Sequence, residues 1–480
     1  MQDSLLGRLR VGVDHNPLAR RGLLALACVV FGLIGGVVTA AISPLAGFAA
    51  IAGLGVVAAI LVNPLVGVLA FVGVAYLLPF AVVPAPIGGV KLSFIDVALT
   101  LCLAVWVIRL LIKPEEKLIG SPLDLLIALF LGMAMASFLI GVSSVTAEVT
   151  RFFLKTINSI LFFFSVINCV RTRRQLVMVI SALLVVGFTA AVLGILFYGL
   201  RPTLTVQILS LLRPLGYPTG MGLLRYIAGT DTMRAIGTSI DPNILGGMLT
   251  LAIPLTVAQL FGGAPLVSRR YIVTGLVAMV ICLGLTISRS SWLGAAAGVL
   301  FIGTLKYRRL WVVFGLFLVV LYFIPQGDFV VERLQSAATF EDQSAAMRLG
   351  EYKDALRLIS QYPWLGVGFG SAPSIDEYVA ASSVYLLMAE EMGLLGLGVF
   401  LVTVVVAFRY ALLNSKKITD PRLQAIQVGA MGGTVGALVA GLFDHYYFNL
   451  NFPHTVAIFW LFIGIVVVST RIGLVAPENG

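Results

Sequence analysis

Charged residues are scarce in this chain of 480 residues, where they make up 11% of the total. Soluble globular proteins contain about 25%, so the chain has too little polar surface to fold as a water-soluble globule. Hydrophobic residues account for 59%. Apolar runs of about 20 residues, the length that a helix needs to cross a bilayer, recur from end to end. The composition therefore excludes a set of soluble domains and predicts an all-α fold, a polytopic bundle of transmembrane helices.

Cysteine and histidine are also few, with 4 Cys and 3 His in the chain. Each cysteine lies inside an apolar run, with neither a CxxC pair nor a neighbouring histidine. Such cysteines are typical of small core residues, and they predict neither a disulfide framework nor a zinc site. The net charge of +10 would suggest a nucleic-acid partner in a soluble protein, but in a membrane protein basic residues first determine loop orientation. We therefore expect no nucleic acid as a partner.

Apolar runs divide the chain into about 14 candidate spans, many with basic residues in the turns between them. The spans are 22–43, 44–62, 65–83, 93–113, 122–142, 152–170, 175–200, 243–262, 271–288, 290–305, 310–325, 383–412, 425–443 and 454–474. If the N-terminus is cytoplasmic, 20 of the 32 Lys and Arg residues fall on the cytoplasmic side. This agrees with the positive-inside rule and predicts that both termini are cytoplasmic.

Two long loops are predicted on the opposite, outer side. The loop 201–242 is rich in Gly, Pro and Leu, and we expect it to lie on the membrane or dip into it. The loop 326–382 is polar, and its apolar residues Leu349, Tyr352, Leu356 and Ile359 are spaced by three, four and three. That spacing predicts an amphipathic helix in water. Pro363 ends this helix, and a flexible turn is predicted after it.

The 12 basic residues that orientation does not require include nine arginines. The planar guanidinium of arginine makes two-point contacts with phosphate oxygens and stays charged when it is partly desolvated. An outer set of arginines therefore indicates an anionic ligand that carries phosphate. Ion pairs with acidic neighbours are the alternative for each of them. The 12 residues are Lys91, Arg151, Lys155, Arg201, Arg213, Arg225, Arg234, Arg289, Arg333, Arg348, Lys353 and Arg357.

Three segments place an arginine near a predicted helix start or at the boundary of a predicted span. Arg234 precedes a turn in which Asp241 or Asn243 can cap a helix that opens at Ile244, and a helix N-terminus favours an anion. Arg289 lies between two apolar runs among serines; its alternative is to extend to the membrane interface. Arg348 begins the amphipathic helix, and its alternative is a pair within that helix with Glu351 or Tyr352.

In this order and at this spacing, these segments resemble the O-antigen ligase/polymerase superfamily of bacterial membrane proteins. The resemblance covers roughly residues 225–450. In that family an Arg precedes a Gly and a helix-opening Pro-Asn, a later span ends on Ser-Arg, and an Arg-containing helix leads into Pro-x-x-Gly-x-Gly. The matching positions are Arg234, Gly237, Pro242, Asn243, Ser288, Arg289, Arg348, Pro363, Gly366 and Gly368.

The family's next segment, His-Asn-x-Tyr-Leu followed by Glu-x-Gly, matches only in part. Tyr385, Leu386, Glu391, Gly393 and Gly396 agree, but Ser382 and Ser383 stand where the family usually has His and Asn. In ligases that His assists the acceptor hydroxyl, so its absence favours a polymerase or moves the base elsewhere. Two residues are candidates for the base: Glu391, because a carboxylate within a span is costly, and His445, which follows Asp444 on the outer side.

The resemblance implies an enzyme at the outer face of the bacterial cytoplasmic membrane, the inner membrane, with its active site facing the periplasm or the exterior. It implies a multi-pass glycosyltransferase that polymerises oligosaccharide repeat units carried on undecaprenyl diphosphate. The product would be O-antigen, as in lipopolysaccharide, or an exopolysaccharide of the cell envelope. One alternative is a ligase that transfers the glycan to a lipid core or another acceptor. An alternative of another class is a polyprenyl-linked glycan flippase or an anion transporter.

The resemblance also implies a division of the chain and roles for its residues. Residues 1–200 would be N-terminal transmembrane helices, and 201–480 the catalytic region that includes both outer loops. The expected partners are the lipid-linked oligosaccharide, membrane lipid, a glycan acceptor and a regulator of chain length. No cofactor is expected, and no metal, since the outer loops lack Asp-x-Asp. The implied roles are diphosphate binding by Arg234, Arg289 and Arg348, catalysis by Arg348, Glu391 and His445, and acceptor or sugar binding by Ser382, Tyr385 and Asp444.

Overall fold

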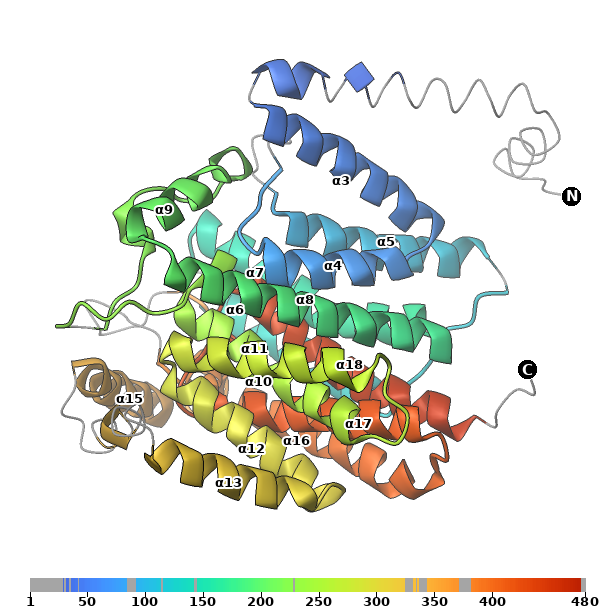
Figure 1. Ribbon diagram of the computed structural model, residues 1–480. Coiled ribbons are helices and arrows are strands. Elements are labelled where there is room, and N and C mark those ends of the chain that lie inside the picture. The colour runs from blue at the N-terminus through green and yellow to red at the C-terminus, as the bar shows by residue number, and fades with distance from the viewer. Residues whose placement is uncertain are drawn as a thin grey trace, which may run out of the picture.

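Each apolar run predicted from 44–62 onward forms one α-helix in the computed structural model (Figure 1). The structure describes residues 29, 32–33, 36–41, 43–83, 92–113, 115–141, 145–227, 229–323, 331–333, 335, 343–370 and 381–475. The predicted span 22–43 lies mostly outside these residues. The helices are α3 (Pro44–Val62), α4 (Leu65–Leu77), α5 (Phe94–Ile112), α6 (Asp124–Ile140), α7 (Ala147–Cys169), α8 (Arg173–Gly199), α9 (Pro202–Ser210), α10 (Pro242–Phe261), α11 (Arg269–Thr286), α12 (Arg289–Leu305), α13 (Arg309–Phe323), α15 (Gln343–Gln361), α16 (Val384–Asn414), α17 (Pro421–Ala440) and α18 (Pro453–Leu474).

Length and composition make this a multi-pass membrane protein. Nine of the helices in the described part of the chain are long and apolar enough to cross a membrane: α3, α5, α7, α8, α10, α11, α16, α17 and α18. The helices α4, α6, α12 and α13 also coincide with predicted spans but are shorter, at 13, 17, 17 and 15 residues. The described residues form no strand beyond two isolated bridges. The predicted all-α polytopic bundle is confirmed.

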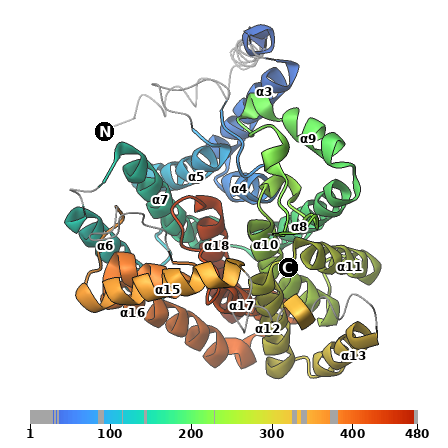
Figure 2. The same ribbon diagram turned by 90° about the vertical axis from the view of Figure 1, so that its left-hand side faces the viewer.

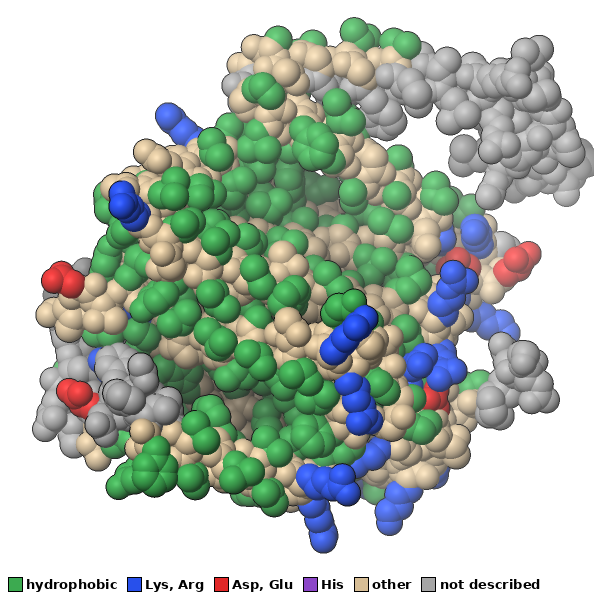
Figure 3. Space-filling model, viewed as in Figure 1, with side chains coloured by type: hydrophobic (Ala, Val, Ile, Leu, Met, Phe, Trp, Pro, Cys, Tyr) green, Lys and Arg blue, Asp and Glu red, His purple; other side chains and the backbone are tan. Residues whose placement is uncertain are grey.

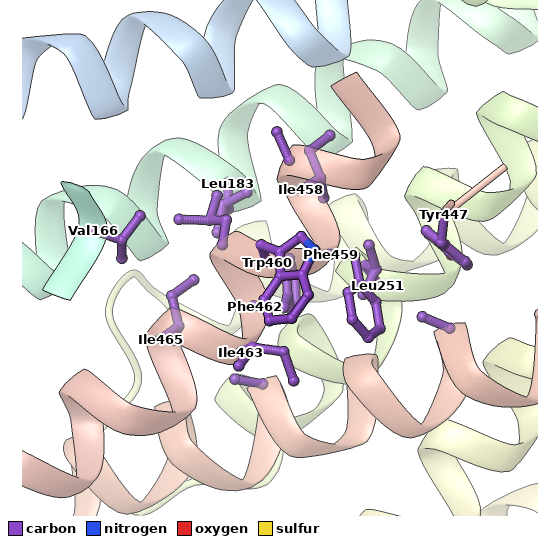
Figure 4. Close-up of a cluster of buried hydrophobic side chains, with 14 of the residues drawn as sticks. Val166, Leu183, Leu251, Tyr447, Ile458, Phe459, Trp460, Phe462, Ile463 and Ile465 are labelled. Carbon is purple, nitrogen blue, oxygen red and sulfur yellow. The ribbon is translucent and has the colours of Figure 1, made fainter. Parts of the chain in front are cut away.

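Helix α18 lies at the centre of the bundle and is buried along most of its length. Its Trp460 and Phe462 pack among side chains of other helices, including Val166 of α7, Leu183 of α8 and Leu251 of α10 (Figure 4). The same buried core contains residues from both predicted regions, 1–200 and 201–480. The helices before residue 200 therefore contribute to the support of the later ones.

Helices α12 and α17 approach each other closely because glycines line their contact. Gly294 and Gly298 of α12 face Gly436 and Gly432 of α17, so that each helix presents two glycines four residues apart. A Cβ atom on Gly298 would lie 2.4 Å from the carbonyl oxygen of Gly432. Small residues at this spacing allow membrane helices to pack backbone against backbone. The contact fixes the turn before α12 relative to the turn after α17.

Basic side chains gather at one end of the bundle, toward the right-hand edge of Figure 3. The turns at that end join α5 to α6, α7 to α8, α10 to α11, α12 to α13 and α16 to α17, and most of the basic residues predicted to be cytoplasmic lie in or beside them. Because the helices alternate in direction, the turns before α10, α12, α16 and α18 all lie at the opposite end. Helix α15 lies across that second end (Figure 2). We refer to it as the outer end, following the positive-inside rule.

Labelling of single cysteines will test this orientation. In a cysteine-free background, Arg357→Cys on α15 is expected to react with a membrane-impermeant maleimide added outside cells, because Arg357 is exposed at the outer end. Lys416→Cys, exposed after α16, is expected to react only after the cells are permeabilised. The reverse pattern would place the candidate site described below in the cytoplasm and overturn its proposed function.

Candidate functional site at the outer end

Arg234 connects the loop before α10 to the end of α11. Its Nε donates to the carbonyl oxygen of Thr286 at 2.8 Å, and its Nη2 donates to the Asn243 side chain at 2.7 Å. Asp241 caps α10 by accepting hydrogen bonds from the backbone N–H groups of Asn243 and Ile244. Of the two predicted caps, Asp241 is therefore the one that forms, and Asn243 binds the arginine instead.

Several charges surround the guanidinium of Arg234. Burial lowers its pKa to about 10; the carboxylates of Asp241 and Asp444 oppose this effect, while the positive charges of Arg333 and Arg348 add to it. These groups come from four separate segments of the chain: the loop before α10, the segment 331–333, α15 and the turn between α17 and α18. The fold thus gathers several arginines and two carboxylates around one position.

Arg289 is the first residue of α12, and only 8% of its surface is exposed. Its Nη1 donates to the backbone carbonyl oxygen of Arg333 at 3.2 Å. The alternative in which Arg289 extends to the interface is wrong, because the side chain is buried and binds the backbone of Arg333. A buried guanidinium beneath a second arginine is suited to an anion.

Serines on both sides of Arg289 form a hydrogen-bonded ladder. The Ser288 hydroxyl lies 3.2 Å from that of Ser290 and 2.9 Å from that of Ser291. Ser290 donates to Oδ2 of Asp444 at 3.4 Å, and the Ser291 hydroxyl lies 3.3 Å from that of Tyr446. The turn before α12 is thereby joined to the turn between α17 and α18.

Arg348 forms an ion pair with the same carboxylate, at 3.7 Å from Oδ2 of Asp444. The alternative pair within its own helix is wrong, because Glu351 and Tyr352 make other contacts. Glu351 accepts a hydrogen bond from the backbone N–H of Ser382 at 3.0 Å. Tyr352 donates to the carbonyl oxygen of Ser382 at 3.1 Å. These contacts hold α15 against the start of α16 and direct Arg348 toward Asp444.

Asp444 is the meeting point of these segments. It is buried, its Oδ1 accepts from the backbone N–H of His445 at 3.0 Å, and its Oδ2 faces Arg348 and Ser290. Burial raises the pKa of Asp444, while the charges of His445 and Arg348 act in the opposite direction. A buried carboxylate that is held mainly by one arginine is sensitive to any ligand that competes for that arginine.

His445 lies beside Ser382, although 63 residues separate them in the sequence. The His445 Nδ1 is 3.1 Å from the carbonyl oxygen of Ala381. Because a carbonyl only accepts, Nδ1 is the protonated nitrogen in this contact, and Nε2 is left as the basic one. The ring is therefore oriented as a general base would be.

Tyr385 and Glu391 lie on α16, at increasing depth from the outer end. The Tyr385 hydroxyl donates to the carbonyl oxygen of Leu438 at 2.8 Å. Glu391 is buried, and its backbone carbonyl accepts from Gly368 N–H at 3.1 Å and from the Ser137 hydroxyl. Within the described residues, no hydrogen bond or ion pair joins Glu391 to the three arginines or to Asp444. The structure therefore gathers the arginines, Asp444, His445 and Ser382, and leaves Glu391 apart.

Helix α16 is broken at Gly393, where the segment after α15 binds to it. Gly393 has φ of 70° and ψ of 178°, and Leu394 N–H donates to the carbonyl oxygen of Pro363 at 2.7 Å. Val367 N–H donates to the carbonyl oxygen of Glu390 at 2.9 Å. The turn predicted after Pro363 is thus bound to the break through its backbone. Buried partners of this kind allow irregular backbone at membrane depth.

This break makes Gly393 sensitive to substitution. Gly393→Ala is expected to lower the free energy of unfolding by at least about 2 kcal/mol, because only glycine readily adopts this conformation. The new Cβ would also lie 2.2 Å from the carbonyl oxygen of Trp364. Gly398→Ala on the same helix is the control, since a Cβ there meets no atom within 4 Å. Thermal unfolding in detergent measures both, and equal melting temperatures would contradict the expectation.

Sequence reasoning did not assign a role to three residues of the cluster. Ser290 and Tyr446 extend the hydroxyl ladder, and the backbone carbonyl of Arg333 accepts a hydrogen bond from Arg289. Arg333 had a signal in the sequence as one of the outer basic residues that orientation does not require, and Ser290 as one of the serines beside Arg289; Tyr446 had none. As for metals, the described part of the chain contains no group of three His, Cys, Asp or Glu residues that could hold an ion.

The fold and the cluster define a class: a polytopic α-helical membrane protein with an arginine-rich polar site at one end. Residues 274–401 match the family model described as O-antigen ligase. The predicted relationship to the O-antigen ligase/polymerase superfamily is confirmed over this segment, which indicates a glycosyl-transferring membrane enzyme. It contains Arg289, Arg348, Ser382, Tyr385 and Glu391, whereas Arg234, Asp444 and His445 lie outside it. No curated protein matches the chain.

Proposed function

We propose that the protein is a glycosyltransferase that polymerises oligosaccharide repeat units carried on undecaprenyl diphosphate, at the outer face of the bacterial cytoplasmic membrane. The observation that carries the proposal is the gathering of Arg234, Arg289 and Arg348 around Asp444 at the end opposite the basic turns. Guanidinium groups from separate elements can contact a diphosphate from several sides. The family match supports glycosyl transfer as the reaction.

In the proposed reaction, an acceptor hydroxyl oxygen attacks C1 of the donor sugar. The bond between C1 and the phosphate oxygen breaks, and undecaprenyl diphosphate leaves with the bonding electron pair. The arginines stabilise the negative charge that develops on the diphosphate, because they are fixed before the reaction begins. Arg348 would bind the diphosphate in place of, or together with, its present partner Asp444.

The acceptor proton requires a base, and two groups were candidates. His445 is the better placed, because its Nδ1 contact with Ala381 leaves Nε2 available beside Ser382. Ser382 is the position where the family usually has its histidine. In this proposal the imidazole comes from the turn before α18 and takes that role. Glu391 makes its contacts with α6 and the segment after α15, so we assign it to the support of the helix break.

The remaining polar groups would contact the acceptor or the transferred sugar. Ser382 is half-buried, its backbone binds Glu351 and Tyr352, and it directly follows Ala381, whose carbonyl oxygen contacts the His445 ring. Tyr385, with its hydroxyl bound to Leu438, is limited to contacts through its ring. Asp444 can accept a sugar hydroxyl when Arg348 moves to the diphosphate. A regulator of chain length stays a prediction.

A ligase is the second candidate, and it is favoured by the description of the matching family model. The test is to incubate purified protein in detergent with a lipid-linked repeat unit, alone or with a lipid-core acceptor. A ladder of longer lipid-linked products supports the polymerase, and transfer only to the core supports the ligase. Detergent abolishes any gradient, so turnover there also separates an enzyme from a flippase or anion transporter. No conversion with either acceptor would overturn the proposed function.

A further inference from the structure

Helix α16 is longer than a membrane requires, and the break at Gly393 divides it. The part after the break, 394–414, takes 21 of its 31 residues. At about 1.5 Å per residue this part is roughly 31 Å long, which matches a hydrocarbon thickness of about 30 Å. Lys416 and Lys417 follow it and mark its cytoplasmic boundary. The part after the break can therefore span the membrane alone, with the break at the outer boundary of the hydrocarbon.

The exposed side of this span is almost entirely apolar. Arg409 is its one exposed charge, and it lies close enough to the cytoplasmic boundary for the guanidinium to extend there. An exposed apolar surface on a membrane-spanning helix contacts lipid. This lipid-facing stripe begins directly after the break. Its residues are Leu394, Leu395, Leu401, Val402, Val405, Leu412 and Leu413.

Trp364 lies at the outer end of the lipid-facing stripe, in the segment that follows α15. The carbonyl oxygen of Pro363 accepts from Leu394 N–H at 2.7 Å. The carbonyl oxygen of Trp364 itself is 2.2 Å from where a Cβ on Gly393 would lie. The Trp364 side chain is 67% exposed, and Tyr362 is also exposed. Two aromatic side chains are thus held where lipid contact begins, and such rings favour the membrane–water interface.

Helix α15, beside α16 at the outer end (Figure 2), has three different sides. Ala355 and Leu358 are buried. Leu349 and Leu356 are seven residues apart and share a second side, on which Leu356 is exposed. Asp354 is exposed about 160° around the helix from Leu356. One apolar and one polar exposed side are typical of a helix that lies in the plane of the membrane interface.

We propose that the end of α15 is a membrane anchor, in which Trp364, Tyr362 and Leu356 insert among the headgroups of the outer leaflet. The partner is bulk bilayer lipid, because this apolar surface continues the stripe along which lipid covers α16. The anchor fixes α15 relative to the membrane at one end, while Arg348 binds Asp444 near the other. This inference holds whatever reaction the site catalyses.

Fluorescence quenching by brominated lipids tests the anchor. The chain has 5 tryptophans, and a full-length variant that keeps only Trp364, with Phe at the other four positions, is reconstituted in phosphatidylcholine vesicles. Trp364 is expected to lose more fluorescence to bromine near the headgroups than to bromine near the ends of the acyl chains. The matched control keeps only Trp460, which is 2% exposed and should lose less to either lipid.

Three results would overturn the proposal. Quenching of Trp364 no stronger than that of Trp460 would mean that protein covers the indole. Stronger quenching by the deep bromine would place the ring in the hydrocarbon core. Quenching by acrylamide from the water, together with none by either lipid, would place it in solvent.

A spin label provides a second measurement if the melting temperature shows that the single-tryptophan variant is not folded. Trp364→Cys in a cysteine-free background is labelled with a nitroxide in the reconstituted protein. The label is expected to collide more often with oxygen, which concentrates in lipid, than with a water-soluble nickel chelate. Asp354→Cys, on the polar side of α15, is the control and should show the opposite preference. The same preference at both positions would contradict the anchor.

Discussion

Arg348→Ala is expected to abolish glycan transfer, with a loss of at least about 10³-fold in the rate of product formation. Arg348 is the arginine that pairs with Asp444, the residue at which α12, α15 and the turn before α18 meet. Its removal takes away a positive charge that is needed when the diphosphate leaves. It also leaves the Asp444 carboxylate buried without its ion pair, which raises the pKa of Asp444 further. Turnover of a lipid-linked repeat unit by purified protein measures the effect.

Two further variants separate charge from geometry. Arg348→Lys keeps the positive charge but not the planar guanidinium, so we expect a loss of about 10²-fold or more. Arg357→Ala removes an exposed arginine from the same helix and should leave the rate unchanged. Melting temperatures show whether each variant is folded. Retention of more than a tenth of wild-type activity by Arg348→Ala would exclude Arg348 from the chemistry.

The helices of this protein could be predicted from sequence because lipid imposes one simple rule. A backbone in hydrocarbon must satisfy its own hydrogen bonds, so each apolar run between basic turns becomes a helix. The break at Gly393 could not be predicted, since it lies within one long apolar pattern. Pro363, whose carbonyl oxygen accepts from Leu394 N–H at the break, comes 31 residues before Leu394. The break therefore depends on tertiary packing, which a local pattern does not report.

The arginines could be identified from sequence, but most of their partners could not. Local spacing offered Glu351 and Tyr352 as partners for Arg348, since residues three and four apart are neighbours on a helix. The actual partner, Asp444, is 96 residues away in sequence. It is brought there by the close packing of α12 on α17 and by the attachment of α15 to Ser382. Arg289 was open to the alternative of reaching the interface because the sequence did not show which polypeptide covers it.

His445→Ala is expected to lower the rate of glycan transfer by about 10²–10⁴-fold, the usual contribution of a general base. Nδ1 of His445 binds the carbonyl oxygen of Ala381, which fixes the tautomer and leaves Nε2 to accept the proton. Binding of undecaprenyl diphosphate should change little, because the arginines are retained. Glu391→Gln should have a smaller effect on the rate than His445→Ala, since Glu391 is not joined to the cluster.

A second substitution distinguishes a base from a structural residue. Ser382 follows Ala381 directly, so a histidine introduced there would lie beside the position of the His445 ring. Ser382→His alone is expected to be tolerated. The double variant Ser382→His with His445→Ala should transfer glycan at least about tenfold faster than His445→Ala alone. Added imidazole should likewise raise the rate of His445→Ala, because it can occupy the space of the missing ring and accept the proton. If His445→Ala is fully active, His445 is not the base. If His445→Ala is inactive and neither the second histidine nor imidazole restores activity, the role of His445 is structural, in the turn before α18. The arginines are then the only groups assigned to the chemistry.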